Sequence, residues 1–149
     1  MTDAHFLSIK STVMVVDDEP ELVTIVRLML EQEEFNVRYA YSGPQLFAGL
    51  EKEKTDLIIL DVMLPQMDGL EMLRRLKGAP ETLSIPVILI TALDQYVNIL
   101  TGCKMGADEY ITKPFTRTQL ITSINRLLNG EQGHSLESLY KGKCDNVLD

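Results

Sequence analysis

Three stretches of the chain have the same sequence pattern: VMVVDDE at residues 13–19, LIILD at residues 57–61 and VILIT at residues 87–91. Each begins with consecutive apolar residues and ends in polar ones. Apolar runs without alternation are typical of strands that are buried on both faces of a parallel sheet. Because ligands of such sheets bind outside the carboxyl ends of the strands, the polar residues are expected to meet at one edge of the sheet.

Helical patterns separate these strands. One helix is predicted to begin near Pro20, which suits the first turn of a helix, and another at Ser42-Gly43-Pro44. The remaining patterns predict short strands at residues 36–40 and 110–112, and helices at residues 69–77, 95–105 and 116–129, the last capped by Thr116. This alternation predicts a doubly wound α/β fold with right-handed crossovers.

The composition excludes several classes of protein. The chain has 14 Lys and Arg against 22 Asp and Glu, so its net charge is −8, which argues against direct binding to nucleic acid. No apolar run approaches the roughly 18 residues that span a bilayer, so no membrane segment is expected. Cys103 and Cys144 have no metal-ligand spacing and predict no disulfide framework. We therefore expect a cytoplasmic protein.

The length of 149 residues suits one domain with a sizeable core. We expect an N-terminal tail at residues 1–10 and a folded domain at residues 11–129. The helix and strand patterns stop after Gly130, so residues 130–149 are interpreted as a tail or the start of a linker, with a short helix around residues 136–140 left open.

The polar residues at the strand ends are Asp17, Asp18, Asp61, Thr91 and Lys113. Together they predict a small acidic metal site with room for a phosphoryl group. Each residue also has a simpler interpretation: the first two aspartates would cap the helix that begins at Pro20, and the lysine would be solvated. No capping explanation requires all five at one edge, so the set favours a site.

Four motifs resemble the receiver domain of two-component response regulators. They are VVDDEP at residues 15–20, DVMLPQMDG at residues 61–69, TA at residues 91–92 and GADEYITKPF at residues 106–115. The resemblance covers about residues 11–129. It implies a flavodoxin-like (βα)5 fold, with five parallel strands in the order 2-1-3-4-5.

The resemblance assigns a role to each site residue. Asp61 is similar to the phosphoacceptor, a carboxylate nucleophile that forms an acyl phosphate. Asp17, Asp18, Asp61 and the backbone carbonyl of Met63 are expected to bind Mg²⁺ or Mn²⁺, ions that favour oxygen ligands. Lys113 is expected to pair with Asp61 or with the phosphate, and the Thr91 hydroxyl to follow the phosphoryl group.

Four further features follow from the resemblance. Lys113-Pro114 is expected to be a cis peptide. Gly69 is expected to permit a turn geometry that other residues resist, or else to be a glycine that simply starts a helix. Tyr110 occupies the position of the family's switch aromatic, and the alternative interpretation is an edge-strand tyrosine packed against the last helix. Met63 and Leu93 are apolar where regulators with short-lived phosphates often carry polar groups, which predicts slow dephosphorylation.

The predicted function is a phosphorylation-dependent switch that catalyses only its own phosphorylation and dephosphorylation. The expected donor is a histidine kinase or a histidine phosphotransfer protein. The expected output is a change in the face made by the fourth helix, fifth strand and fifth helix, which regulates a downstream protein or an attached output domain. This face also makes a homodimer possible, although Gln119 and Ser123 replace the acidic residue and the arginine of one common dimer.

Three alternatives remain open from the sequence. A Mg²⁺-dependent phosphohydrolase using Asp61 would need a second acid two residues later, where Met63 stands. A flavodoxin-like cofactor carrier would need a phosphate loop after the first strand, where acidic residues stand. A receiver used as a binding module without phosphorylation is the third alternative.

Overall fold

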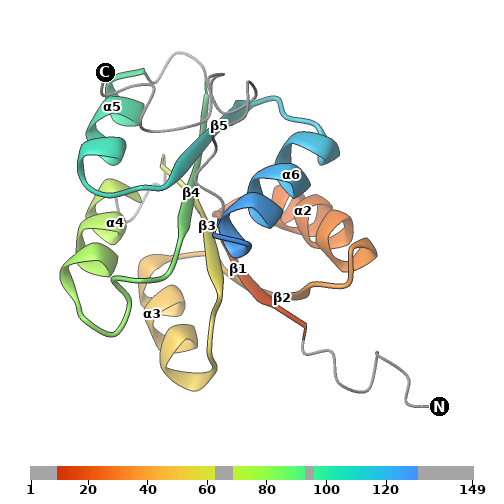
Figure 1. Cartoon of the computed structure of the whole chain (residues 1–149), viewed down its shortest axis with the longest axis horizontal. Coiled ribbons are helices and arrows are strands. Elements are labelled where there is room, and N and C mark those ends of the chain that lie inside the picture. Colours follow the sequence, from red (N-terminus) through yellow and green to blue (C-terminus); the bar gives the residue numbers. More distant parts are fainter. Residues whose placement is uncertain (1–9, 63–68, 93–95, 131–149) are drawn as a thin grey trace.

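The computed structural model describes residues 10–62, 69–92 and 96–130. Its centre is a parallel sheet with the strand order β2-β1-β3-β4-β5, which confirms the predicted order and fold class (Figure 1). The strands are β1 (Thr12–Val16), β2 (Asn36–Ala40), β3 (Leu57–Asp61), β4 (Val87–Ala92) and β5 (Glu109–Lys113).

In the described part of the chain, five helices connect and cover the strands. They are α2 (Pro20–Gln32), α3 (Gly43–Lys52), α4 (Gly69–Gly78), α5 (Tyr96–Lys104) and α6 (Arg117–Leu128). The predicted caps are confirmed at two of them: the Ser42 hydroxyl accepts a hydrogen bond from the amide of Gln45 in α3, and Thr116 forms a capping box with Gln119 in α6.

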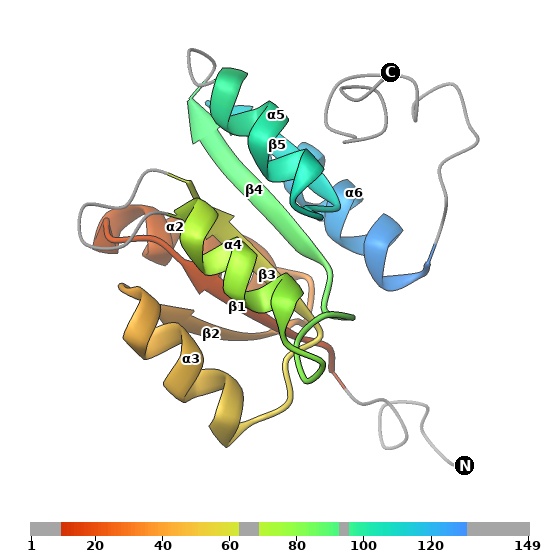
Figure 2. The same cartoon turned by 90° about the vertical axis from the view of Figure 1, so that its left-hand side faces the viewer.

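The sheet separates two hydrophobic cores. Helices α3, α4 and α5 cover one face and helices α2 and α6 cover the other (Figure 2). Successive residues of a strand point to opposite faces, so Leu89 packs with the first group and Ile88 with the second. Strands β1 and β3 are buried along their whole length, as their unbroken apolar runs predicted.

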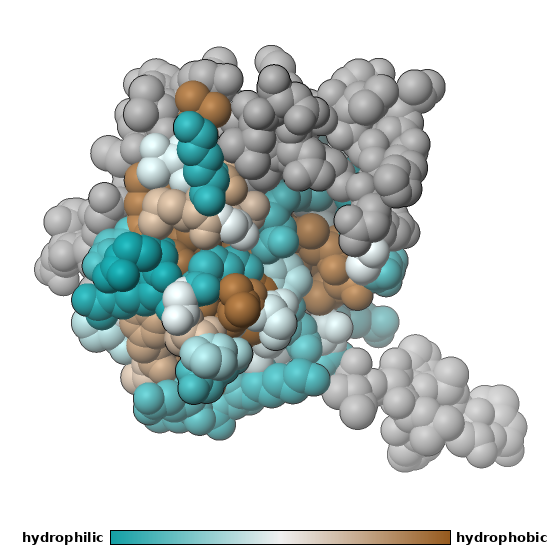
Figure 3. Space-filling view, turned by 60° about the vertical axis from the view of Figure 1, so that its left-hand side comes forward, coloured by the Kyte–Doolittle hydropathy of each residue, from teal (hydrophilic) through white to brown (hydrophobic). Residues whose placement is uncertain are grey.

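The outer surface is that of an ordinary globular domain. Figure 3 shows the side that carries α3 and α4, where hydrophobic residues are interspersed among hydrophilic ones. Among the residues that the structure describes, no helix is both long and apolar enough to cross a membrane.

One expectation about the cysteines differs from the structure. Cys103 is buried in α5 with 5% of its surface exposed and is disulfide-bonded. The sequence predicted no disulfide framework, because the two cysteines show no spacing that reports a pairing. Cys144, the other cysteine of the chain, lies outside the described residues.

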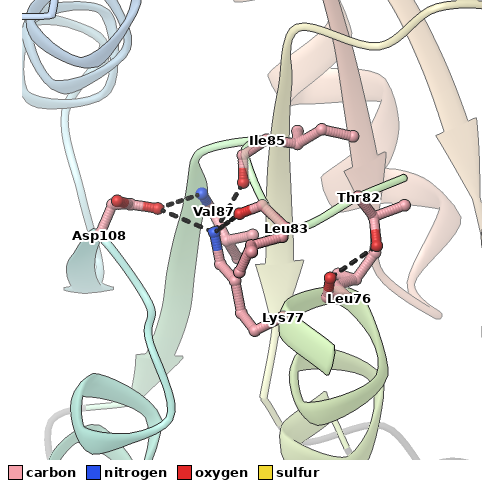
Figure 4. A network of polar contacts seen from close by, with 7 residues as sticks. All are labelled: Leu76, Lys77, Thr82, Leu83, Ile85, Val87 and Asp108. Carbon is pink, nitrogen blue, oxygen red and sulfur yellow. Dashed lines mark hydrogen bonds and ion pairs between the residues drawn. The ribbon is translucent and has the colours of Figure 1, made fainter. Parts of the chain in front are cut away.

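A polar network holds together the amino-terminal edge of the sheet (Figure 4). The Lys77 ammonium group at the end of α4 donates to the carbonyl oxygens of Leu83 at 3.2 Å and Ile85 at 2.8 Å. It also lies 3.5 Å from Asp108, whose carboxylate accepts the Val87 amide at 2.8 Å. These bonds tie the end of α4 to the starts of β4 and β5, at the edge opposite the predicted site.

The free energy of unfolding of the Asp108→Ala variant is expected to be about 2 kcal/mol lower than that of wild type, because the buried Val87 amide loses its acceptor and the Lys77 ammonium group loses one of its partners. Glu71→Ala is the control: its 2.6 Å pair with Arg74 is an ion pair at the surface and is expected to contribute less to stability. Urea unfolding followed by circular dichroism measures both. Equal losses would show that the Asp108 network adds no more stability than the pair between Glu71 and Arg74.

Candidate functional site

The carboxyl ends of the strands bring the predicted polar residues together. Asp17 directly follows β1, and Asp61 is the last residue of β3. In the sheet register Asp61 lies beside Ile90, so Thr91 comes one position further along the neighbouring strand. Lys113, the last residue of β5, lies beside Ala92. The residues named from the sequence therefore lie at one edge.

A buried pair of carboxylates and one lysine form the centre of the site. Asp17 is 2% exposed and Asp61 is 4% exposed. The Lys113 ammonium nitrogen lies 3.1 Å from Oδ2 of Asp61 and 3.9 Å from Oδ2 of Asp17. The single positive charge of Lys113 thus faces two carboxylates that are almost fully buried. The negative charge that Lys113 leaves unbalanced favours binding of a further cation.

Thr91 contributes a hydroxyl without a protein partner. Its Oγ1 atom is buried and has no hydrogen bond to any described residue. Buried hydroxyl groups are nearly always hydrogen-bonded, and leaving one unpaired costs free energy. The Thr91 hydroxyl, which lies next to Lys113 and the aspartates, is therefore suited to donate a hydrogen bond to an oxygen atom of an incoming ligand.

The capping interpretation of the first two aspartates differs from the structure. The residue at the N-cap of α2 is Glu19, and its side chain makes no capping hydrogen bond. Asp17 instead accepts the Glu19 amide at 2.9 Å, which fixes the backbone between β1 and α2. Asp17 and Asp18 are thus outside the cap position, and their carboxylates face the site.

Burial and charge shift the pKa values of two site residues. The pKa of Asp17 is raised from its ordinary value to about 7, with burial as the largest cause. The hydrogen bond and charge of Asp61 also raise this pKa, whereas the Glu19 amide and Lys113 lower it. For Lys113, burial lowers the pKa, but the hydrogen bond and charge of Asp61, with Asp17 and Glu19, outweigh burial and hold it above the ordinary value. The lysine therefore stays charged at neutral pH.

The raised pKa of Asp17 predicts how stability depends on pH. In metal-free protein the folded state binds more protons than the unfolded chain between the ordinary pKa of 3.8 and about 7. The free energy of unfolding should therefore fall as the pH rises through this window and level off above it. Added Mg²⁺ should stabilise the protein more at pH 8 than at pH 5, because it binds the deprotonated carboxylate.

Urea unfolding in a chelator between pH 4 and 8 measures this contribution. Asp17→Asn should remove the fall, whereas Glu51→Gln, an exposed change at the end of α3, should keep it. A slope in Asp17→Asn equal to that of wild type would show that Asp17 does not cause it.

The acidic side chains fit a divalent metal ion. Asp17, Asp18, Glu19 and Asp61 each offer a carboxylate oxygen, and these oxygens lie within 4.8 Å of one another. A small set of oxygen ligands is what Mg²⁺ takes, with water completing its shell. The sequence contained Glu19 within the same motif but gave it no role of its own, because only the fold shows that it faces the lysine.

Gly69 is required for a different reason than predicted. It has no positive φ, so the expected turn geometry is wrong. A Cβ atom at Gly69 would instead lie 2.5 Å from the carbonyl oxygen of Asp61 and 2.7 Å from Cα of Val62. The start of α4 therefore packs directly on the backbone that carries Asp61. The cis peptide at Lys113-Pro114 is confirmed.

Two predicted positions lie outside the described residues: Met63, with its backbone carbonyl, and Leu93. Tyr110 is described and is buried, with 8% of its surface exposed. It packs in the core with Leu89 and Cys103, on the α4 and α5 side of the sheet, and not with the residues of α6. Tyr110 thus packs on the same face of the sheet as Leu89, and Thr91, two residues further along β4, lies on that face as well.

Polar side chains on β5 and α6, beside the site, already have partners within the domain. The Gln119 side chain completes the capping box of α6, and Ser123 is 9% exposed. Arg126 of α6 pairs with the buried Glu109 of β5 at 2.9 Å. A dimer through charged pairs at residues 119 and 123 therefore has no support in the described side chains.

Comparison with known proteins points to one family. The model of the response regulator receiver domain matches residues 13–125. The transcriptional regulatory protein TrcR of Mycobacterium tuberculosis is 39% identical over 116 residues, which cover 78% of this chain and 44% of that protein. The regulatory protein VanRc of Enterococcus gallinarum is 37% identical over 123 residues, covering 83% of this chain and 52% of its own. The chain spans about half the length of these relatives.

Solved structures agree with this assignment. The receiver domain of a signal transduction histidine kinase from Syntrophus aciditrophicus has a TM-score of 0.75 at 32% identity, covering 85% of this chain and 96% of its own. The chemotaxis response regulator CheY4 of Vibrio cholerae has a TM-score of 0.74 at 25% identity, covering 80% of this chain and 99% of its own. The chain therefore belongs to the response regulator receiver domain family, whose members are phosphorylation-dependent signalling switches.

Proposed function

We propose that Asp61 is the phosphoacceptor of this receiver domain and that its donor is a phosphohistidine on a histidine kinase or a histidine phosphotransfer protein. The observation that carries the proposal is the 3.1 Å pair between Lys113 and the nearly buried Asp61, beside the unpartnered Thr91 hydroxyl. A structural ion pair alone does not require a buried hydroxyl without an acceptor. A tetrahedral phosphoryl group on Asp61 supplies that acceptor.

The transfer conserves atoms and charge. A carboxylate oxygen of Asp61 attacks phosphorus, the phosphorus–nitrogen bond of the donor breaks, and the imidazole nitrogen keeps the electron pair. The Lys113 ammonium group holds the attacking carboxylate and then faces the added phosphoryl oxygens. The Thr91 hydroxyl donates to one of these oxygens. Such charge stabilisation by preorganised groups is the main source of catalysis in phosphoryl transfer.

The metal ligands proposed are Asp17, Asp18, Asp61 and the backbone carbonyl of Met63, the last outside the described residues. A bound Mg²⁺ supplies charge that offsets the repulsion between these carboxylates and the phosphoryl oxygens. This chain's own residues provide orientation: Asp17 is fixed by the Glu19 amide, and Asp61 is held by Lys113.

The output proposed is a change in the face of α5, β5 and α6. Movement of Thr91 toward the phosphoryl group alters the space beside Tyr110, which shifts an existing equilibrium of this face. The changed face regulates a downstream protein, an attached output domain or a second copy of the chain. Relatives are named as transcriptional regulators, so the expected absence of direct nucleic-acid binding has no support from the comparisons. A cytoplasmic location and tails at residues 1–10 and 130–149 stay predictions.

Intact-protein mass spectrometry tests the proposed function. Incubation with phosphoramidate or acetyl phosphate and Mg²⁺ should add the mass of one phosphoryl group, and a chelator should prevent this. Repeated turnover of the donor with no retained mass would instead support a phosphohydrolase. No added mass and no donor consumption would support a binding module that works without phosphorylation.

A further inference from the structure

Glu19 stands at the N-cap position of a helix, but its carboxylate does not cap that helix. It occupies the N-cap of α2, yet its side chain accepts no hydrogen bond from the first turn. The backbone there is held by other groups, because Asp17 accepts the Glu19 amide at 2.9 Å and Pro20 begins the helix. Glutamate is not among the favoured N-cap residues, so the cap does not explain why this residue is acidic.

The Glu19 carboxylate faces the phosphorylation site instead. It lies 3.9 Å from the ammonium nitrogen of Lys113, and it belongs to the acidic group whose oxygens are within 4.8 Å of one another. Its side chain is 61% exposed, whereas the side chain of Asp61 is 5% exposed. Glu19 is therefore the acidic residue of this group that lies on the solvent side of the site.

We propose that Glu19 is a specificity-determining residue that disfavours highly anionic phosphodonors. This inference rests on the proposed function of Asp61. A donor approaches from solvent with its negative phosphoryl group toward Lys113, and a carboxylate near that path repels the donor in proportion to its charge. The residue thus favours phosphodonors of lower negative charge over donors of higher negative charge.

Two small donors separate charge from other properties. Acetyl phosphate carries one more negative charge at neutral pH than phosphoramidate, and both form the same bond between Asp61 and phosphorus. Acetate leaves from one donor and ammonia from the other. The ratio of the two rates in one variant therefore cancels any general loss of reactivity and reports discrimination by charge.

The experiment compares wild type with Glu19→Gln, Glu19→Asp and the matched control Glu51→Gln. Calorimetric titration with MgCl₂ first fixes a concentration that saturates each variant, so differences in metal affinity do not enter. Rates of phosphorylation are then measured from intact mass at low salt and near 1 M salt. Glu51 is exposed at the end of α3, so its variant loses the same charge away from Lys113.

Glu19→Gln should raise the ratio of the acetyl phosphate rate to the phosphoramidate rate about fourfold at low salt, the scale of one unit charge acting through several ångströms of water. The increase should vanish near 1 M salt, where the screening length is about 3 Å. Glu19→Asp and Glu51→Gln should keep the wild-type ratio. An unchanged ratio in Glu19→Gln, or an equal rise in Glu51→Gln, overturns the inference while Asp61 chemistry stands. Wild type that accepts neither donor overturns the proposed function as well.

Discussion

The Asp61→Asn variant is expected to take up no phosphoryl group from any donor, a loss of at least about a thousandfold in rate. An amide oxygen is a poor nucleophile, so the acyl phosphate cannot form. The variant should remain folded, because asparagine has the same size and Lys113 still faces the carboxylates of Asp17 and Glu19. Intact mass after incubation with phosphoramidate and Mg²⁺ measures the loss.

Asp56→Asn is the matched control for this variant. Asp56 directly precedes the same strand, β3, at the opposite edge of the sheet, where it accepts the Thr12 amide at 2.7 Å. An asparagine oxygen can keep that bond, so the control should be labelled at the wild-type rate. Labelling of Asp61→Asn at a rate close to that of Asp56→Asn would place the phosphoacceptor elsewhere.

The Gly69→Ala variant is expected to lower the free energy of unfolding by about 3 kcal/mol. Its Cβ atom would lie 2.5 Å from the carbonyl oxygen of Asp61 and 2.8 Å from that of Val62, both backbone atoms that cannot move aside cheaply. Relief requires the start of α4 to move away from the end of β3. The variant should therefore also be phosphorylated more slowly, because Asp61 is displaced.

Gly78→Ala is the control for Gly69→Ala. Gly78 ends the same helix, and a Cβ atom there meets nothing within 4 Å. Alanine should stabilise this position by about 0.5 kcal/mol, since it restricts the unfolded chain. Urea unfolding of the two variants gives the comparison. Similar small effects at both positions would show that the contact between α4 and β3 is loose enough to accept a methyl group.

Local sequence patterns were sufficient to predict the strands and helices of this fold. The unbroken apolar runs of β1, β3 and β4 predicted buried parallel strands, and Ser42 and Thr116 marked two helix starts. Parallel strands also align their carboxyl ends, so the sequence could predict that Asp61 and Lys113 meet. The strand order came from the resemblance to receiver domains, because apolar periodicity does not report which strands are neighbours.

Contacts between distant residues could not be predicted in this way. The Lys77 and Asp108 pair joins residues 31 positions apart, and neither residue differs locally from a solvated charge. The close approach at Gly69 depends on how α4 meets β3, which no local pattern records. Glu19 has the sequence position of a helix cap, and only the folded edge of the sheet places it 3.9 Å from Lys113.

The most direct test of the central claim is to identify the residue that carries the phosphoryl group. Borohydride reduces an aspartyl phosphate to homoserine, so labelled protein can be reduced, digested and sequenced by mass spectrometry. We predict homoserine at position 61 in the peptide that contains LIILD, only when both donor and Mg²⁺ were present. Homoserine at Asp17, Asp18 or another acidic residue, with position 61 intact, would contradict the assignment of Asp61 as the phosphoacceptor.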